Sequence, residues 1–168
     1  MTTLYLARHG ETVDNVNRIM QGQTQGRLTP CGIRQAEELR DSMAQTCLDA
    51  VVASDLRRAV DTAAIIAEPH GLPVTTTPLL RERDWGSFTG RYIPELKDEP
   101  WPNDIETLDQ LKARAAVFLD LMRREHAGQT VLAVGHGIIN KAIQAVLYGK
   151  PMQEIKRMEN AEVRKLEL

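Results

Sequence analysis

The chain has 168 residues, a length typical of one domain with a substantial core, so we expect a single domain over residues 1–168. Hydrophobic residues make up 42% of the chain and charged residues 26%, and a formal net charge of −2 without long runs of like charge argues against a nucleic-acid surface. Its 2 cysteines form no disulfide framework, and neither a signal peptide nor an apolar run of about 18 residues occurs, so we expect a cytoplasmic protein without membrane contact.

The first predicted element is a strand at Leu4–Ala7, a short apolar run that leads directly into Arg-His-Gly. A helix is predicted to begin at Pro30, because Thr29 is a suitable N-cap and proline is favoured in the first turn. Its apolar residues recur at helical spacing, and we expect the core-facing side chains to be Ile33, Ala36, Leu39 and Met43.

The next predicted strand is Asp49–Ala53, and a second helix follows it. We expect Ser54 and Asp55 to cap this helix and the turn at Pro69–Gly71 to end it. Its predicted buried residues are Leu56, Ala59, Val60, Ala63 and Ala67.

A long loop is predicted at Leu79–Asp104, which is rich in glycine and proline and has room for a short helix near Ile93–Lys97. Loops of this length inside a domain usually have a function. A third helix is predicted from about Ile105 to His126, with Gly128 ending it. Its predicted core positions are Leu108, Leu111, Ala115, Phe118 and Met122.

The last part of the chain repeats the strand-and-helix pattern. The apolar run Val131–Val134 predicts a strand, and a fourth helix follows from Gly137 or Ile138 to just before Gly149. This helix is expected to bury Ile139, Ala142, Ile143 and Val146, and Val163–Leu168 predicts a final strand. The alternation of strands and helices favours parallel strands covered by helices on both faces.

Two histidines occupy equivalent positions in this pattern. His9 directly follows the first strand and His136 directly follows the strand Val131–Val134, and each precedes a glycine. Because ligands of parallel α/β sheets bind at the carboxyl ends of the strands, neighbouring strands would place both histidines in one crevice. The glycines would let a ligand approach the backbone, and the N–H groups that begin the fourth helix would favour an anion beside His136.

Arginines supply a matching positive charge. Arg8 precedes His9, and Arg57 and Arg58 follow the end of another strand. Guanidinium groups bind phosphate oxygens through paired N–H donors, whereas the alternative is that these are ordinary surface arginines. A basic residue at a helix N-terminus opposes the helix dipole, and a bound anion would offset that cost.

Five sequence blocks, in order, resemble the histidine phosphatase superfamily, also called the phosphoglycerate mutase-like family. Together they extend over nearly the whole chain. They are Arg8-His9-Gly10-Glu11-Thr12 with Asn15; Leu28-Thr29-Pro30 with Gly32; Ser54-Asp55-Leu56-Arg57-Arg58-Ala59 with Thr62-Ala63; Leu80, Glu82, Gly86 and Gly90; and Val134-Gly135-His136-Gly137.

The resemblance implies a role for each matching residue. His9 would be the nucleophile and Glu82 the general acid, while Arg57 would face solvent. The transferred phosphoryl group would be bound by Arg8, Arg58 and His136, with further hydrogen bonds from Asn15 and the backbone of Gly137. The implied fold is a three-layer α/β/α sandwich with a mixed, mostly parallel sheet that has one antiparallel strand.

The chemistry of these residue types fits phosphoryl transfer. A neutral imidazole can attack phosphorus in line, two arginines and a second histidine can neutralise the phosphoryl charge without a metal, and a carboxylic acid can protonate the departing oxygen. We therefore expect a metal-independent phosphatase that hydrolyses small phosphate monoesters through a phosphohistidine and requires no cofactor.

The chain departs from the family in two places. Thr89 stands where the family often has an acidic residue, and only a short cover, Arg91–Asp104, is available where mutases tend to have a longer insertion. A short cover admits water, which favours hydrolysis. The alternatives are a phosphoglycerate mutase that uses the same phosphohistidine, a non-catalytic phosphate-binding module, and a metal-dependent hydrolase that uses both histidines.

The substrate is not specified by the sequence, although we expect a small phosphorylated metabolite. The expected substrate-binding residues lie in the irregular segment after the first motif: Gln21, Gly22, Gln23 and Thr24. Trp85 and Trp101 either line the pocket or cover the core. Both a monomer and a homodimer agree with the sequence.

Overall fold

A five-stranded sheet forms the centre of the computed structural model, which describes all residues, 1–168. Its order is β3-β2-β4-β1-β5, and only β5 runs antiparallel to its neighbour. The predicted mixed, mostly parallel sheet is confirmed. The strands are β1 (Thr3–Arg8), β2 (Ala50–Ser54), β3 (Val74–Thr77), β4 (Thr130–Gly135) and β5 (Val163–Glu167).

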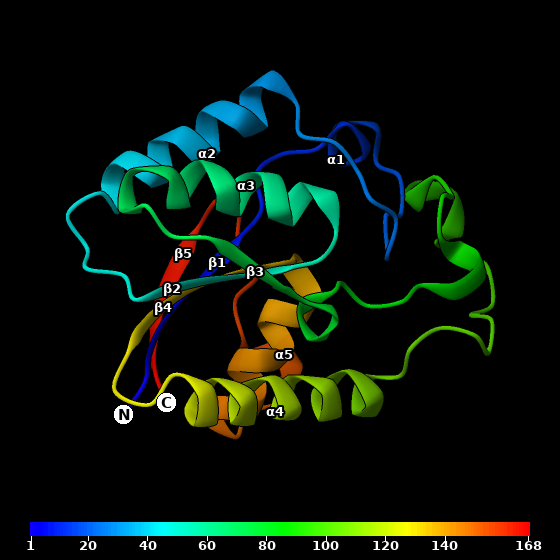
Figure 1. Ribbon diagram of the computed structural model, residues 1–168. Coiled ribbons are helices and arrows are strands. Elements are labelled where there is room, and N and C mark those ends of the chain that lie inside the picture. Colours follow the sequence, from blue (N-terminus) through cyan, green and yellow to red (C-terminus); the bar gives the residue numbers. More distant parts are fainter.

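Helices cover both faces of this sheet, which confirms the three-layer sandwich. In Figure 1, α2 and α3 lie on one face and α4 and α5 on the other. No helix has the length and apolar character needed to cross a membrane. The α-helices are α1 (Val13–Asn17), α2 (Pro30–Ser42), α3 (Arg57–Ala67), α4 (Leu108–Glu125) and α5 (Gly137–Tyr148).

Short 3₁₀ helices and one α-helix lie in segments for which the sequence predicted little regular structure. The expected short helix near Ile93–Lys97 is present as η4 (Ile93–Leu96). Helix α1 and the edge strand β3 were not predicted. The remaining 3₁₀ helices are η1 (Glu68–His70), η2 (Pro78–Leu80), η3 (Gly86–Phe88) and η5 (Met152–Glu154).

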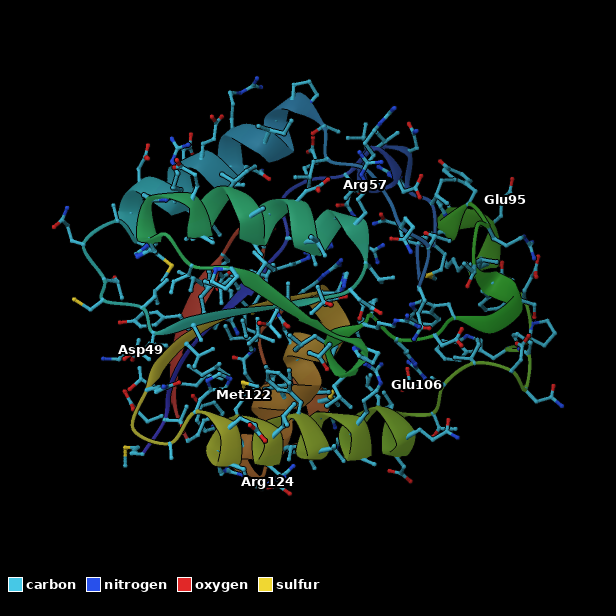
Figure 2. The ribbon with its side chains drawn as sticks, in the orientation of Figure 1. Asp49, Arg57, Glu95, Glu106, Met122 and Arg124 are labelled. Atoms are coloured by element: carbon cyan, nitrogen blue, oxygen red, sulfur yellow. The ribbon has the colours of Figure 1, made fainter.

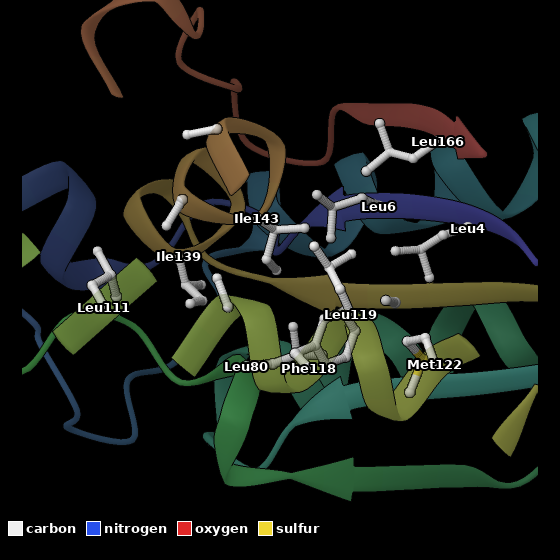
Figure 3. Packing of buried hydrophobic residues seen from close by; sticks show 14 of the residues in the cluster. Leu4, Leu6, Leu80, Leu111, Phe118, Leu119, Met122, Ile139, Ile143 and Leu166 are labelled. Carbon is white, nitrogen blue, oxygen red and sulfur yellow. The ribbon is translucent and has the colours of Figure 1, made fainter. Parts of the chain in front are cut away.

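Each central strand contributes to two hydrophobic cores, because successive side chains point to opposite faces. Leu4 and Leu6 of β1 pack with α4 and α5 in one core, whereas Ala7 packs under α2 and α3 in the other. Figure 3 shows the first core, in which Phe118 and Ile143 lie close to β1 and β4. Burial on both faces explains why these strands are continuous apolar runs.

The predicted boundary at Thr29 is confirmed, because its side chain accepts the N–H of Gly32 and Pro30 begins α2. Helix α4 starts at Leu108, later than predicted, where Thr107 forms a capping box with Gln110. Two predicted core positions, Ile33 and Leu108, were wrong, and two others, Val60 and Val146, are less buried than predicted, although Val146 packs against the first core. Ile33 is 42% exposed and Leu108 44% exposed, while Val60 and Val146 are half-buried.

Ser54 and Asp55 do not cap α3, contrary to the prediction. The N-cap is Leu56, which makes no side-chain cap hydrogen bond. The Ser54 hydroxyl accepts the N–H of Leu56 and bonds to His136, while Asp55 pairs with Arg81 through two contacts of 2.7 Å. Ser54 thus contacts Leu56 and the distant His136, and Asp55 pairs with Arg81. Neither side chain caps the helix.

Glycine is required where the end of β1 meets the first turn of α2. A Cβ on Gly10 would lie 2.4 Å from the carbonyl oxygen of Gly32, and a Cβ on Gly32 would lie 2.1 Å from that of Glu11. The expectation that Gly10 leaves room for a ligand therefore needs correction, since the space is taken by α2. This contact holds the loop after β1 against the helix.

We predict that Gly32→Ala lowers the free energy of unfolding by about 1–3 kcal/mol, because the added methyl group overlaps fixed backbone. Helix propensity alone would favour alanine by about 1 kcal/mol, so the two effects differ in sign. Urea denaturation measures the change. Arg34→Ala, at an exposed position of the same helix, is the control, and an unchanged or more stable Gly32→Ala variant would contradict the prediction.

Candidate active site

The two histidines meet where β1 and β4 end. Arg8 pairs in register with Gly135, so the next residues, His9 and His136, lie side by side. Their ring centroids are 5.0 Å apart with the planes inclined by 62°, and both side chains are buried. The expected shared crevice therefore forms at the carboxyl edge of the sheet.

His9 has one ring nitrogen free. Its Nδ1 lies 2.7 Å from the carbonyl oxygen of Gly10, and because a carbonyl only accepts, Nδ1 must carry the proton. The lone pair is then on Nε2. Burial, followed by the positive charge of Arg58, lowers the pKa of His9 to about 3, so the ring is a neutral base at physiological pH.

His136 is held through its other ring nitrogen, Nε2, whereas His9 is held through Nδ1. Its Nε2 lies 2.9 Å from the Ser54 hydroxyl oxygen, and its buried Nδ1 has no hydrogen-bond partner. In the tautomer in which the Ser54 hydroxyl donates to Nε2, the ring proton lies on Nδ1, which has no acceptor within the protein. Burial and the charge of Arg58 set the pKa of His136 well below 6.5.

Arg8 and Arg58 place two cations beside these rings. Both are nearly fully buried, at 7% and 1% exposure. Arg8 donates to the carbonyl of Met158 at 2.8 Å, and Arg58 donates to the carbonyls of Gly22, at 2.8 Å, and Thr24. The Nε of each guanidinium has no partner, and an unpaired buried donor is costly unless a ligand binds it.

Burial is the main cause that lowers the pKa of both arginines, that of Arg58 to about 10. Both therefore stay protonated at neutral pH. The Nε atoms of both arginines and Nδ1 of His136 are buried without a partner, Arg8 and Arg58 line the same cleft as His9, and the His136 ring lies 5.0 Å from the His9 ring. A tetrahedral oxyanion such as a phosphoryl group would supply the negative charge that balances these cations and the acceptors for their unpaired donors.

Glu82 occupies the N-terminus of α5. Its Oε2 accepts the N–H of Ile138 at 3.0 Å, and its Oε1 accepts those of Ile139 at 3.0 Å and Arg83 at 2.9 Å. The expectation of a ligand anion on these N–H groups needs correction, because the protein's own carboxylate is bound there. Gly137, the first residue of the helix, remains outside this interaction and lies against the Arg8 guanidinium.

Asn15 is oriented by its own helix start. Its Oδ1 accepts the N–H of Thr12 at 3.0 Å in the capping box of α1, and also a hydrogen from Asn160 at 3.3 Å. Both hydrogens of its Nδ2 are therefore left without a partner, and Asn15 lines the cleft. This leaves it able to donate to a ligand.

A cleft of about 220 Å³ opens over His9. Gln21 and Gly22 of the expected substrate-binding segment line it, but Gln23 and Thr24 do not, because Gln23 donates to the Glu82 carbonyl and the Thr24 carbonyl binds Arg58. The lining residues are Arg8, His9, Asn15, Ile19, Met20, Gln21, Gly22, Arg58, Glu82, Trp85, Ile93, Ile138 and Arg157.

The segment expected to cover the site contributes little to it. Of Arg91–Asp104, only Ile93 lines the cleft. Trp85 lines it as well, whereas Trp101 is 61% exposed and packs edge-on against Trp85. Figure 2 shows Glu95 at the outer side of the segment and Glu106 where the chain turns back to α4.

Two residues near the site were missed by the sequence analysis. Arg157 lines the cleft, and Asn160 donates to the His9 carbonyl at 3.2 Å and to Asn15. No local signal could have found them, since they lie about 150 residues from His9 in the chain. Arg57, as expected, is exposed, and Figure 2 labels it near the start of α3.

The alternative of a metal centre on the two histidines lacks further ligands. No group of three or more histidine, cysteine, aspartate or glutamate side chains is arranged to hold a metal ion. Zinc sites with catalytic activity usually have three protein ligands. The unpaired atoms around His9 are donors on two arginines and a histidine, which suit an anion.

These features define an α/β protein that brings two histidines and two buried arginines to the carboxyl edge of its sheet, and a family model agrees. The model of the histidine phosphatase superfamily (branch 1) matches residues 4–168, so the chain belongs to this superfamily. Its solved structural neighbours include phosphatases, and the chain is an enzyme of the phosphatase type.

Individual relatives carry both phosphatase and mutase names. The chain is 33% identical to the "Probable phosphoglycerate mutase GpmB" of Yersinia pestis (strain Pestoides F), over 94% of this chain and 80% of that protein. The mycobacterial glucosyl-3-phosphoglycerate phosphatase, in complex with VO3, has a TM-score of 0.88 at 29% identity, covering 98% and 92% of the two chains. The α-ribazole phosphatase of Shigella flexneri has a TM-score of 0.89 at 26% identity, covering 99% and 90%.

We predict that the buried neutral histidines make the protein acid-sensitive. In the unfolded chain they bind protons near pH 6.5, whereas in the folded protein His9 does so only near pH 3 and His136 well below 6.5. Stability is therefore lost as pH falls below 6.5, by about 2 kcal/mol at pH 5 for His9 and by a further amount for His136.

Urea denaturation at pH 7 and pH 5 measures this change. The His9→Gln variant should lose about 2 kcal/mol of the pH dependence, because the His9 imidazole is removed. An equal dependence in both proteins would contradict the assignment of His9 as a buried neutral ring.

Proposed function

We propose that this enzyme hydrolyses small phosphate monoesters through a phosphohistidine on His9, without a metal ion. The observation that carries the proposal is the free Nε2 of a neutral His9 beside three unpaired buried donors, on Arg8, Arg58 and His136. The proposed nucleophile and the positively charged groups that would bind the phosphoryl group thus belong to one site.

In the first step, His9 Nε2 attacks phosphorus in line with the departing oxygen. The N–P bond forms as the P–O ester bond breaks, and its electron pair goes to the leaving alkoxide. Arg8, Arg58 and His136 bind the three equatorial oxygens, and the amide of Asn15 adds a donor. Positioning and charge neutralisation of this kind are the main requirements of phosphoryl transfer.

Glu82 supplies and recovers the proton. Its Oε1 is occupied by the N–H groups of Ile139 and Arg83, whereas Oε2 accepts only from Ile138, so Oε2 has room for a proton. The protonated carboxyl donates to the leaving oxygen. Its carboxylate then accepts a proton from the water that attacks the phosphohistidine, which releases phosphate and restores His9.

A phosphoglycerate mutase is the second candidate, because curated relatives carry that name. It would share the first step and return the phosphoryl group to a substrate oxygen. Hydrolysis is favoured because the cover segment adds only Ile93 to the cleft and leaves it accessible to water. Measuring free phosphate against isomer formation separates the two.

We predict that quenched turnover of a ³²P-labelled ester leaves acid-labile, base-stable label on His9. The His9→Ala variant should retain neither label nor turnover, because no other free imidazole lines the cleft. His126→Ala, which removes a half-buried histidine at the end of α4, outside the cleft, is the matched control. Label on another side chain, or rapid turnover without any label, would contradict the proposal.

We predict that Glu82→Gln slows an alkyl phosphate by roughly 10²–10⁴-fold and p-nitrophenyl phosphate far less. The glutamine oxygen can keep the bonds from Ile139 and Arg83, while its amide cannot deliver a proton to the alkoxide. Nitrophenolate departs without protonation, so kcat for each ester gives the comparison. Equal slowing of both esters would show that Glu82 is not the acid.

A further inference from the structure

Every hydrogen bond of the Arg114 side chain, on α4, goes either to the segment that carries Glu82 or to Glu106. Its Nη1 donates to the carbonyls of Leu79, at 2.9 Å, and Arg81, at 2.6 Å, and its Nη2 donates to that of Glu82 at 3.4 Å. Its Nε and Nη2 bind the two carboxylate oxygens of Glu106 at 3.0 and 2.9 Å. Arg114 does not line the cleft, so its contacts act on the backbone of the loop and not on a ligand.

The backbone from Leu79 to Glu82 has no strand partner. It belongs to no strand, and none of the carbonyls of Leu79, Arg81 and Glu82 accepts a backbone N–H. Besides Arg114, one other side chain binds this set of carbonyls, since Gln23 donates to that of Glu82 at 3.2 Å. The course of this irregular backbone therefore depends on the Arg114 guanidinium.

Glu106 joins the end of the same loop to the residues that follow Glu82. Its N–H donates to the Asp84 carbonyl at 2.9 Å, its Oε1 accepts the Asp84 N–H at 3.0 Å, and its carbonyl accepts Nε of Arg83 at 2.8 Å. The Arg114–Glu106 pair, with side chains 17% and 13% exposed, is more protected from solvent than any other ion pair of the chain. One buried cation thus holds the chain on both sides of Glu82.

The geometry of proton transfer gives this support a consequence. The Glu82 carboxylate is bound by the N–H groups of Ile138 and Ile139 at the start of α5, while its backbone is bound by Arg114 of α4. Helices α4 and α5 pack together in the first core. A proton donor must lie within about 2.6–3.2 Å of the oxygen that it protonates, and a displacement of about 1 Å can cost roughly 100-fold in rate.

We propose that Arg114 is a positioning residue for proton transfer: it fixes the backbone of Glu82, and thereby the place of the carboxyl group, without contacting the substrate. Glu106 assists by holding the guanidinium in orientation through two charge-assisted hydrogen bonds. This inference rests on the proposed function and adds a residue of α4 to the support of its general acid.

The leaving-group dependence of Arg114→Gln tests the proposal. We expect kcat for an alkyl phosphate to fall by roughly 10- to 100-fold, with little change for p-nitrophenyl phosphate, whose leaving group needs no proton. Partial unfolding lowers both rates by the same factor, so the ratio of the two rates reports proton transfer alone. In a protein that already carries Glu82→Gln, the Arg114→Gln substitution should change this ratio no further.

Arg114→Lys keeps a positive charge opposite Glu106 and so avoids an unpaired buried carboxylate, which could prevent Arg114→Gln from folding. A compact ammonium cannot replace the planar fork that binds three carbonyls and a carboxylate, so the ester ratio should change in the same direction by a smaller factor. Arg123→Gln, on the same helix, is the matched control, because it removes an exposed ion pair with Asp120 and should leave the ratio unchanged.

Amide hydrogen exchange gives a readout that does not depend on activity. The first N–H groups of a helix have no partner within the helix, and those of Ile138 and Ile139 are bound by the Glu82 carboxylate. Their protection from exchange should be lost in Arg114→Gln or Arg114→Lys and kept in Arg123→Gln.

Equal slowing of both esters in the folded Arg114 variants, while Glu82→Gln slows the alkyl ester selectively, would overturn the inference and leave the proposed function standing. A further change of the ratio in the double variant would also overturn it, because Arg114 would then act independently of Glu82. Rapid turnover without label on His9 would instead refute the proposed function, whichever ratios the variants gave.

Discussion

The parallel pairing of β1 with β4 is the constraint on which the site depends. Register sets Arg8 opposite Gly135, and the two residues that follow are the paired histidines. A slip of one residue would turn Leu4 and Leu6 out of their core as well as separate the rings. Packing on both faces of the sheet therefore stabilises the geometry of the site and the fold together (Figures 1 and 3).

Buried charge is the second organising feature. Removing two guanidinium groups from water is costly, and backbone carbonyls of irregular segments offset part of that cost. Gly22 and Thr24 bind Arg58, and Met158 binds Arg8. These segments thus hold the cations in place, while the Nε atom of each guanidinium is left without a partner and supports the anion site that we propose. The same cations and the same burial keep both histidines neutral.

Glu82 is positioned from two directions. The N-terminus of α5 holds its carboxylate through the N–H groups of Ile138 and Ile139, where the helix dipole also favours a negative group. Its backbone is held by Arg114 of α4, which pairs with Glu106 at 2.9 Å and donates to the carbonyls of Arg81, at 2.6 Å, and Glu82, at 3.4 Å. A residue in a long loop is thereby held by two helices, which suits the role of proton donor that we propose for it.

The sequence by itself determined the elements whose signals are local: the apolar strands, the start of α2 at Thr29-Pro30, and the Arg-His-Gly and His-Gly motifs at two strand ends. Tertiary structure alone decided which side chains reach the site. Ser54 looked like a helix cap but bonds His136, and Asn160 and Arg157 join the site from near the opposite end of the chain. The physical reason is that caps and periodicity act within a few residues, whereas these contacts exist only after the strands have paired across the sheet.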